Sequence, residues 1–288
     1  GADALPTYTQ IWEQELKDSY SFTTYVPLRK GQKIGNDSLT VIEQVSAGGF
    51  SAVYLVEKEN GERLVLKESV VPEDFEETKE KVREHFKREA RLLMKLNHSG
   101  IVQVMDHFVE NDKDYLLLEY VSGKPLRSLV EKMVPEPARV VEWSIQLASV
   151  IKYLHEEDPP VLHRDITPDN LILYGDNRVK LIDFGAANEF VGQATGTLVG
   201  KQSYMPPEQI RGKCTRQSDI YSFGATLFFL LTGSDPEPLS SSAPRSIVDS
   251  IPEELDELVR RCTDLEQDDR YETIDQVLAE LEFIEKQI

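Results

Sequence analysis

The residues best suited to chemistry stand close together in the middle of the chain. Asp165 ends the run His-Arg-Asp, Asn170 follows it by five positions, and Asp183, in Asp-Phe-Gly, follows it by eighteen. Together they supply three hard oxygen donors. Mg²⁺ takes one or two such protein oxygens and fills its remaining positions with water and substrate phosphates. The spacing therefore predicts a magnesium site that handles a phosphate group.

Five charged residues elsewhere gain meaning from their order along the chain. Lys67 stands in an apolar strand-like run, where an unpaired ammonium is unfavourable, so it needs a partner such as Glu89. Further on come Glu208 in Pro-Pro-Glu, Asp219 in Ser-Asp-Ile-Tyr, and Arg270. Each of these, taken singly, is typical of a solvated surface. Their order and gaps around the central motifs favour a functional interpretation.

With these motifs the chain resembles the catalytic domain of a eukaryotic-type (Hanks-type) Ser/Thr protein kinase of the bacterial branch, over about residues 39–285. The resemblance implies an α+β, bilobal fold, with a small antiparallel β-sheet lobe carrying one main helix and a larger, mostly helical lobe. We expect an N-terminal extension at 1–38, the small lobe and hinge at 39–121 and the large lobe at 122–288. The implied activity is transfer of the γ-phosphoryl group of ATP to protein Ser or Thr hydroxyls.

The resemblance also assigns roles to residues. It implies that Asp165 accepts or orients the substrate hydroxyl proton and that Asn170 and Asp183 hold Mg²⁺, with Mn²⁺ as an alternative. Lys67, fixed by Glu89, would clamp the phosphates of ATP. The other residues implied to bind ATP are Gly48, Gly49, Val53, Val65, Leu118, Glu119 and Val121, and those implied to be structural are Arg164, Glu208, Asp219 and Arg270.

The phosphate-binding loop departs from the family pattern. Where the family has Gly-x-Gly-x-x-Gly, residues 46–51 read Ser-Ala-Gly-Gly-Phe-Ser, so only the middle glycine, Gly48, is kept, with Gly49 beside it. Backbone amides at these glycines still suit a phosphate. Val65 replaces an alanine that usually touches adenine, and Pro125 replaces an acid that often binds ribose, which leaves the ribose contacts open.

Thr167 and Lys201 form a second departure. The family usually has a lysine two residues after the catalytic aspartate and a threonine in the substrate loop, and here the two residue types have changed places. In the family fold these side chains meet beside the catalytic aspartate. We therefore expect Lys201 to supply positive charge at the γ-phosphate and Thr167 to donate its hydroxyl to Asp165. The alternative is that Lys201 points to solvent.

The sequence leaves two other classes of function open. A pseudokinase would keep the fold as a nucleotide-binding or scaffolding module, but the presence of Asp165, Asn170 and Asp183 argues against it. A small-molecule phosphotransferase is disfavoured by the Pro-Pro-Glu motif and Asp219.

The substrate preference and a regulatory modification are also predicted. Pro168, three residues after Asp165, favours Ser/Thr over Tyr as the phosphate acceptor. Thr195 and Thr197 are candidate autophosphorylation sites, because Arg164 can hold a phosphate there through a bidentate contact.

The hydrophobic pattern indicates the elements that position these residues. Asn60-Gly61 predicts a hairpin, since both turn positions favour a positive φ. An apolar face of Val82, Phe86, Ala90 and Leu93 predicts the small-lobe helix. Strands are predicted at 39–45, 52–58, 63–68, 101–108, 115–120, 171–173 and 179–181, and further helices at 9–19, 140–154, 219–231, 253–263 and 273–285.

Composition limits the partners. The 288 residues carry 51 acids against 32 bases, a net charge of −19, which disfavours nucleic acid and suggests basic protein substrates. Two cysteines and no signal peptide favour a cytoplasmic protein, and no membrane segment is expected in this chain, so that an anchor of the parent protein would lie outside it. The predicted helix at 9–19 would pack on the small lobe or support self-association.

Overall fold

The computed structural model describes residues 26–48, 51–70, 84, 86–88, 90–183 and 202–288. The chain divides into two compact units. The sheet unit comprises residues up to 92 together with 104–118, and the helical unit comprises 93–103 and 119–288. This division of strands and helices confirms the predicted α+β class with a sheet lobe and a helical lobe. The predicted helix at 9–19 lies outside the described residues.

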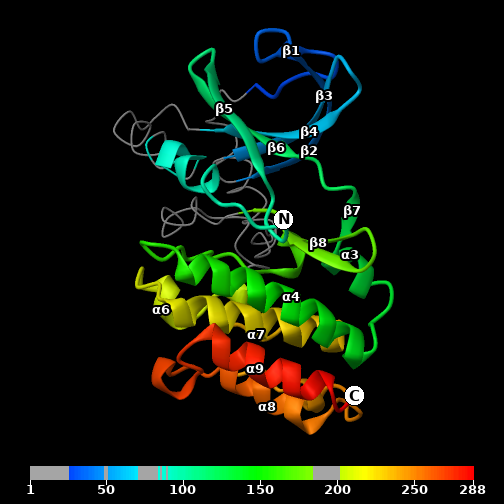
Figure 1. Ribbon diagram of the computed structural model, residues 1–288, viewed down its shortest axis with the longest axis vertical. Coiled ribbons are helices and arrows are strands. Elements are labelled where there is room, and N and C mark those ends of the chain that lie inside the picture. The colour runs from blue at the N-terminus through cyan, green and yellow to red at the C-terminus, as the bar shows by residue number, and fades with distance from the viewer. Residues whose placement is uncertain (1–25, 49–50, 71–83, 85, 89, 184–201) are drawn as a thin grey trace, which may run out of the picture. The chain divides into compact units, whose positions relative to one another are not determined.

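The sheet unit is built on six strands in the order β1-β2-β3-β4-β6-β5 (Figure 1). Each strand pair with a described register is antiparallel. The strands are β1 (Lys33–Ile34), β2 (Leu39–Gly48), β3 (Ser51–Lys58), β4 (Arg63–Ser69), β5 (Val104–Glu110) and β6 (Lys113–Glu119).

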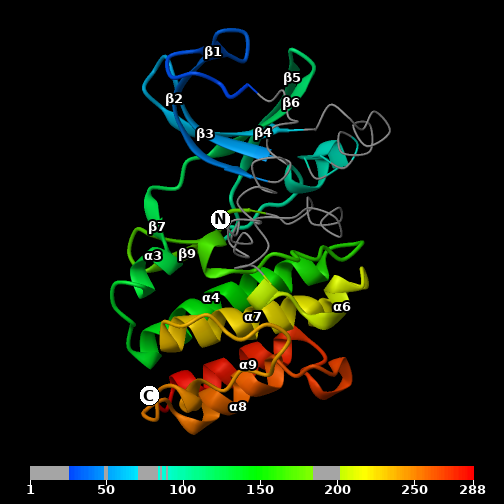
Figure 2. The same ribbon diagram turned by 180° about the vertical axis from the view of Figure 1, so that it is seen from behind.

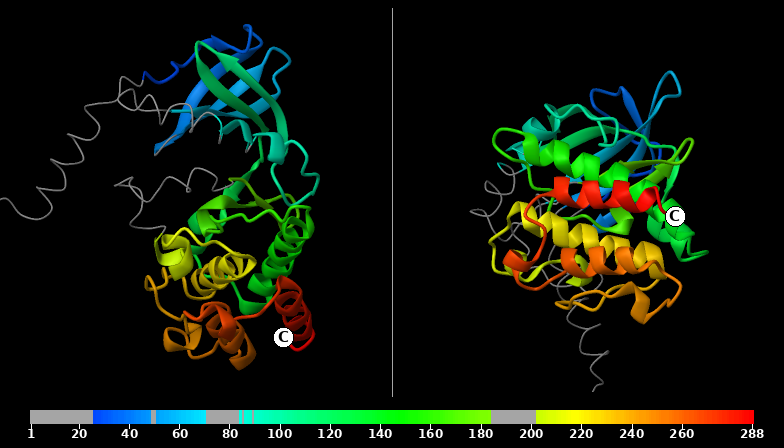
Figure 3. Two further views of the ribbon diagram at one scale, coloured as in Figure 1. Left: turned by 90° about the vertical axis from the view of Figure 1, so that its left-hand side faces the viewer. Right: turned by 60° about the horizontal axis from the view of Figure 1, so that its bottom comes forward.

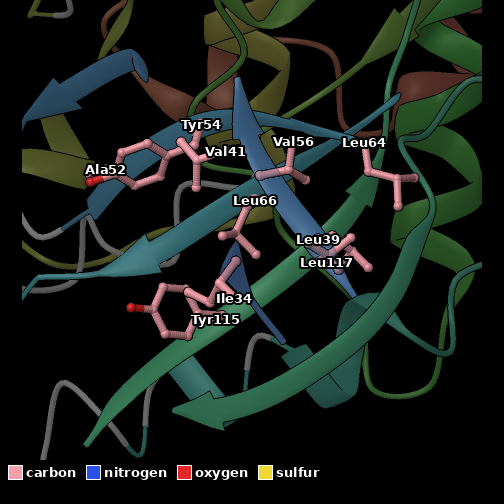
Figure 4. Packing of buried hydrophobic residues seen from close by; sticks show 10 residues of the cluster. All are labelled: Ile34, Leu39, Val41, Ala52, Tyr54, Val56, Leu64, Leu66, Tyr115 and Leu117. Atoms are coloured by element: carbon pink, nitrogen blue, oxygen red, sulfur yellow. The ribbon is translucent and has the colours of Figure 1, made fainter. Parts of the chain in front are cut away.

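Alternation along the strands collects apolar side chains on one face of this sheet. On β3, Ala52, Tyr54 and Val56 are buried, and Leu66 and Leu64 lie opposite the last two on β4. Figure 4 shows these side chains beside others from β1, β2 and β6, gathered into one cluster. The full cluster is Ile34, Leu39, Val41, Ala52, Tyr54, Val56, Leu64, Leu66, Tyr115 and Leu117. The intervening residues of β3 and β4 are left for the opposite face.

The sheet begins before residue 39, the predicted start of the small lobe. β1 pairs with β2, Ile34 is buried in the core cluster, and Leu28 packs against that cluster. The backbone N–H of Leu28 also donates to the hydroxyl of Tyr54 at 3.2 Å. A strand of two residues is too short for alternation to appear in the sequence, which is why the pattern assigns these residues to the extension.

The turns of the sheet unit differ in one respect from the prediction. The hairpin at Asn60-Gly61 is present, but of the two only Gly61 has a positive φ, of 83°. Asn60 instead accepts the Glu62 N–H through Oδ1 at 3.0 Å. Two consecutive positive φ angles occur instead at Asn111 and Asp112, between β5 and β6, where φ is 51° and 60°, and at Asn36 and Asp37, between β1 and β2, where φ is 53° and 64°. Asn and Asp enter this region more readily than other side chains, because their short polar groups bond locally.

The small-lobe helix is described at residues 84, 86–88 and 90–93. Phe86, Ala90 and Leu93 are buried, as the predicted apolar face requires, and Phe86 lies 6.3 Å from the ring of His107, between ring centroids. Val82 lies outside the described residues.

The helical unit combines a three-stranded antiparallel sheet, β7-β8-β9, with a set of helices (Figure 2). The right panel of Figure 3 shows α9 running along α4. In the described ranges no helix has the length and apolar character needed to cross a membrane. The elements are β7 (Gly123–Pro125), α3 (Leu126–Val130), α4 (Pro137–Glu156), η1 (Pro168–Asn170), β8 (Leu171–Tyr174), β9 (Arg178–Leu181), η3 (Gln202–Tyr204), α6 (Pro207–Ile210), α7 (Arg216–Thr232), η4 (Pro244–Ser246), α8 (Glu253–Cys262), η5 (Gln267–Asp269) and α9 (Ile274–Glu285).

Helix α7 is the buried centre of this unit. Every residue from 218 to 232 is buried, as its apolar sequence predicts. At its N-terminus the hydroxyl of Ser218 accepts the Thr215 N–H at 2.9 Å. The helix ends at Gly233, whose φ of 72° lies in the left-handed region that favours glycine.

Helix α6 is fixed to the rest of the unit by a buried ion pair. Arg270 donates to Glu208 from Nη1 at 2.7 Å and from Nη2 at 3.1 Å, and Ser218 donates its hydroxyl to the same carboxylate at 2.8 Å. Burial by itself would raise the pKa of Glu208, but the hydrogen bonds from Arg270 and Ser218 outweigh it and leave the pKa below its ordinary value. The carboxylate is therefore ionised and satisfied.

Removing one partner of this pair should destabilise the protein strongly. In Arg270→Met the Glu208 carboxylate stays buried without its cation, so we expect the free energy of unfolding in urea to fall by about 3–5 kcal/mol. Arg245→Met is the matched control, since Arg245 faces Glu253 at 3.6 Å with side chains 41% and 77% exposed. That exposed pair should contribute less than about 1 kcal/mol. Equal effects of the two variants would contradict the assignment.

The same pair should shape the acid limb of the stability curve. Because the pKa of Glu208 is lower in the folded than in the unfolded chain, its contribution is complete above the unfolded pKa and disappears as the pH falls through the folded one. Unfolding curves at a series of acid pH values should therefore show a shallower loss of stability in Arg270→Met than in the wild type. An unchanged slope would mean that the pair does not depress this pKa.

Candidate active site

One buried carboxylate holds the loop that carries Asp165. Asp219, on α7, is fully buried, and its two oxygens accept the backbone N–H groups of Arg164 at 2.8 Å and His163 at 2.9 Å. Nε2 of His155, on α4, lies 2.9 Å from the same carboxylate. Arg164 adopts a φ of 67°, which a residue with a side chain rarely takes. The two bonds to Asp219 stabilise this unusual backbone.

Asp165 and Asn170 are bound to each other. The side-chain Nδ2 of Asn170 donates to the backbone oxygen of Asp165 at 2.8 Å and to its Oδ2 at 3.0 Å, and both residues are buried. Asn170 is thus oriented with its amide nitrogen toward Asp165, which leaves its amide oxygen as an acceptor for another group.

The pairing of β8 with β9 brings Asp183 next to this pair. Leu171 lies opposite Leu181, and the Ile182 N–H donates to the Asn170 carbonyl at 3.0 Å. Asp183 is the next residue, and it is half-buried. The three oxygen-bearing residues that the sequence singled out therefore converge at the ends of two adjacent strands.

This donor set fits a magnesium ion. The Asn170 amide oxygen and the Asp183 carboxylate are hard ligands, and Mg²⁺ commonly takes only one or two protein ligands beside phosphate oxygens and water. Within the described ranges no group of three or more His, Cys, Asp or Glu side chains is placed to hold a metal. A site built on one carboxylate and one amide therefore suits an ion that arrives with a phosphate.

The sheet unit presents the residues predicted to hold the nucleotide. Val53 on β3 lies opposite Lys67 on β4, and Val65 stands two residues before Lys67, so all three share the face away from the core cluster. Lys67 is buried. Gly48 is the last residue of β2, in register with Ser51. Gly49 and Glu89 lie outside the described residues, so the predicted pairing of Lys67 with Glu89 stays a prediction.

The predicted hinge is held from one side by a buried lysine. Oε1 of Glu119 accepts hydrogen bonds from Nζ of Lys180 at 2.6 Å and from the Gln103 N–H at 2.8 Å. The Glu119 N–H in turn donates to the Gln103 carbonyl at 3.0 Å. An adenine can therefore meet only the carbonyl of Glu119, not its N–H. Leu118, the residue before Glu119, is buried, and Val121, two residues after Glu119, is half-buried.

The hydrogen bond predicted from the Thr167 hydroxyl to Asp165 is absent. Thr167 is 1% exposed, and its Oγ1 has no hydrogen-bond partner among the described residues, so it does not donate to Asp165. A buried hydroxyl without a partner is unfavourable by about 1–3 kcal/mol, which marks Thr167 as a group that lacks a contact here. Lys201 and the threonines at 195 and 197 lie outside the described residues.

Sequence reasoning missed two residues that support the site, His155 and Lys180. Each contacts a residue 61 or more positions away, Asp219 for His155 and Glu119 for Lys180. A local sequence pattern does not show which distant residues meet. For Lys180 one signal was available, its inward position on the short strand β9, where a buried ammonium needs a carboxylate.

Comparison with known proteins gives this geometry its family. Serine/threonine-protein kinase PrkC of Bacillus subtilis is 29% identical over 259 residues, which cover 84% of this chain and 39% of PrkC. The chain thus spans about two fifths of the length of that relative. Among solved structures, the PpkA-294 apo form aligns with a TM-score of 0.73 and 28% identity, covering 88% of this chain and 99% of that one.

A second solved structure contains a nucleotide analogue. Rad53 1-466 in complex with AMP-PNP aligns with a TM-score of 0.66 and 25% identity over 84% of this chain and 64% of that one. The family model described as the protein kinase domain matches residues 39–284, nearly the whole chain after the extension. The chain belongs to the protein kinase domain family.

Proposed function

We propose that this chain is the catalytic domain of an active Ser/Thr protein kinase, with ATP and Mg²⁺ as its phosphoryl donor and metal. The observation that carries the proposal is the junction of β8 and β9, where Asn170 binds Asp165 and stands beside Asp183. The kinase family supplies the reaction class, and the AMP-PNP complex of the similar Rad53 chain supports ATP as the nucleotide.

The chemistry asks the protein mainly to position groups and to neutralise charge. As the substrate hydroxyl attacks, its proton passes to the Asp165 carboxylate. Its oxygen forms a bond to the γ-phosphorus, and the bond from that phosphorus to the β–γ bridging oxygen breaks, so that ADP leaves. Asn170 orients Asp165 through the 3.0 Å bond. A magnesium ion held by Asn170 and Asp183 would neutralise the phosphate charge.

The substrate proteins are proposed to be basic, because the net charge of −19 attracts cationic partners at a distance. The choice of Ser or Thr rests on Pro168 and on the named function of relatives such as PrkC. Cytoplasmic location and self-association through residues 1–38 stay predictions.

Replacing the metal-binding carboxylate tests the activity. Wild-type protein with labelled ATP, Mg²⁺ and a generic basic protein should transfer label, and Asp183→Asn should lower the rate at least about 100-fold, as expected when one preorganised charge-stabilising group is lost. Asp176→Asn is the matched control, since Asp176 is exposed in the turn between β8 and β9. Nucleotide binding without transfer by the wild type would instead support the pseudokinase.

Lys201 tests the exchange of residue types at the site. If Lys201 supplies the charge at the γ-phosphate, Lys201→Ala should lower turnover about 10²–10³-fold with a much smaller change in ATP affinity. The double exchange Thr167→Lys with Lys201→Thr should recover much of this loss, because it returns one ammonium to the site. Turnover that stays within about threefold in Lys201→Ala, far below the expected range, would make the exchange incidental.

Autophosphorylation is the third test. After incubation with ATP and Mg²⁺, mass mapping should find phosphate on Thr195 or Thr197, where an added dianion can bond to a guanidinium such as that of Arg164. The Asp183→Asn protein treated in the same way should remain unmodified. An active wild type without phosphate on either threonine would refute this site.

A further inference from the structure

Arg127, on the short helix α3, is the centre of a network that the kinase motifs do not include. Its guanidinium lies 4.5 Å from the centroid of the Phe229 ring on α7. The side chain is 19% exposed, whereas its two nearest carboxylates, Asp169 and Asp235, are 50% and 47% exposed. The cation is therefore less solvated than either carboxylate, and it depends on protein groups for its hydrogen bonds.

The guanidinium binds three separate segments. Nε donates to Asp169 Oδ2 at 2.7 Å, and Nη2 donates to the Tyr204 hydroxyl at 3.0 Å and to Asp235 Oδ1 at 3.0 Å. Tyr204 in turn donates its hydroxyl to Asp235. Burial, and then the carboxylate of Asp235, raise the pKa of Tyr204, so the phenol stays protonated as that donor. Nε and Nη2 of Arg127 thus each have defined hydrogen-bond acceptors.

The contact with Asp169 acts on the candidate active site. Asp169 is the middle residue of the three-residue turn η1, and the next residue, Asn170, binds the Asp165 carboxylate. A turn of three residues has few internal bonds; in this one the Asn170 N–H donates to the Thr167 carbonyl at 3.0 Å. The hydrogen bond from Arg127 to Asp169 therefore limits how far the neighbouring Asn170 can move.

We propose that Arg127 is a positioning residue for the reaction: by fixing Asp169 and Tyr204 it sets the position of Asn170, and so of Asp165, relative to the turn at residues 202–204. The inference rests on the proposed kinase function. Arginine suits this task because its planar fork reaches several acceptors at fixed angles, which a lysine cannot reproduce.

The test compares phosphoryl transfer to a peptide with transfer to water. In Arg127→Met we expect kcat to fall about 10–100-fold in both reactions, the scale of a small misplacement of reacting groups, with the KM values for ATP and peptide nearly unchanged. Arg127→Lys should recover only part of this loss. Arg261→Met is the control, since Arg261 also stacks on a ring, that of Tyr271 at 4.1 Å, but lies on α8.

Two kinetic results would overturn the proposal. A rise in peptide KM alone, with ATP hydrolysis intact, would make Arg127 a substrate contact instead of a positioning residue. Unchanged kinetics in an active Arg127→Met protein would remove its role. In the Arg127→Met background, Asp169→Asn should have little further effect, because the two act through one contact.

Hydrogen exchange separates this inference from the proposed activity. Backbone amides in residues 165–171 should exchange about tenfold faster or more in Arg127→Met, since a hydrogen bond to a charged group is of that order, and Arg261→Met should leave them unchanged. This readout needs no turnover. A wild type that transfers no phosphate would refute the proposed function alone, whereas unchanged exchange would refute the positioning role.

Discussion

The candidate site depends on a charge that has been taken out of water. Asp219 is fully buried, and a carboxylate in that position is tolerated only when hydrogen bonds replace its hydration. Three donors do so, the N–H groups of His163 and Arg164 and the ring of His155. Because satisfying the carboxylate requires the backbone N–H groups of His163 and Arg164 to face α7, the same bonds that stabilise the fold also hold Arg164 in its left-handed conformation, directly before Asp165.

Helix α7 also binds other segments through a row of hydroxyl groups on one of its faces. Ser218 donates to Glu208, Ser222 to the Tyr204 carbonyl at 2.8 Å, and Thr226 to the Ile166 carbonyl at 3.1 Å. The three positions are four residues apart, so they share one face of the helix. Apart from Asp219, most of the other buried residues of α7 are apolar and anchor it in the core. A helix buried on all sides thus offers fixed donors to three other segments, namely α6, η3 and the loop that carries Asp165.

The regular elements were predictable from the sequence, and the contacts between them were not. α4 and α7 were expected at 140–154 and 219–231, and they extend over 137–156 and 216–232. They were predictable because an apolar repeat with the helical period, sustained over several turns, indicates an α-helix. The donor set of Asp165, Asn170 and Asp183 was found because spacing and motif order encode it. By contrast, β1 is too short to show a period, the Thr167 hydroxyl does not bond to Asp165, and the partners of Lys180 and Arg127 lie far away in the chain. Local patterns specify elements; satisfying buried charges specifies which loops meet.

The distribution of charge follows the same rule. Buried lysine and arginine side chains with a described partner are matched to acids, Lys180 with Glu119 and Arg270 with Glu208, and the buried Glu68 is matched by Lys113. These three interior pairs are each close to neutral, so they contribute little to the net charge of −19. A net charge acts at long range and is screened by salt, so it bears on encounter with other molecules and not on the fold. The interior pairs, by contrast, act at short range and fix particular segments to one another.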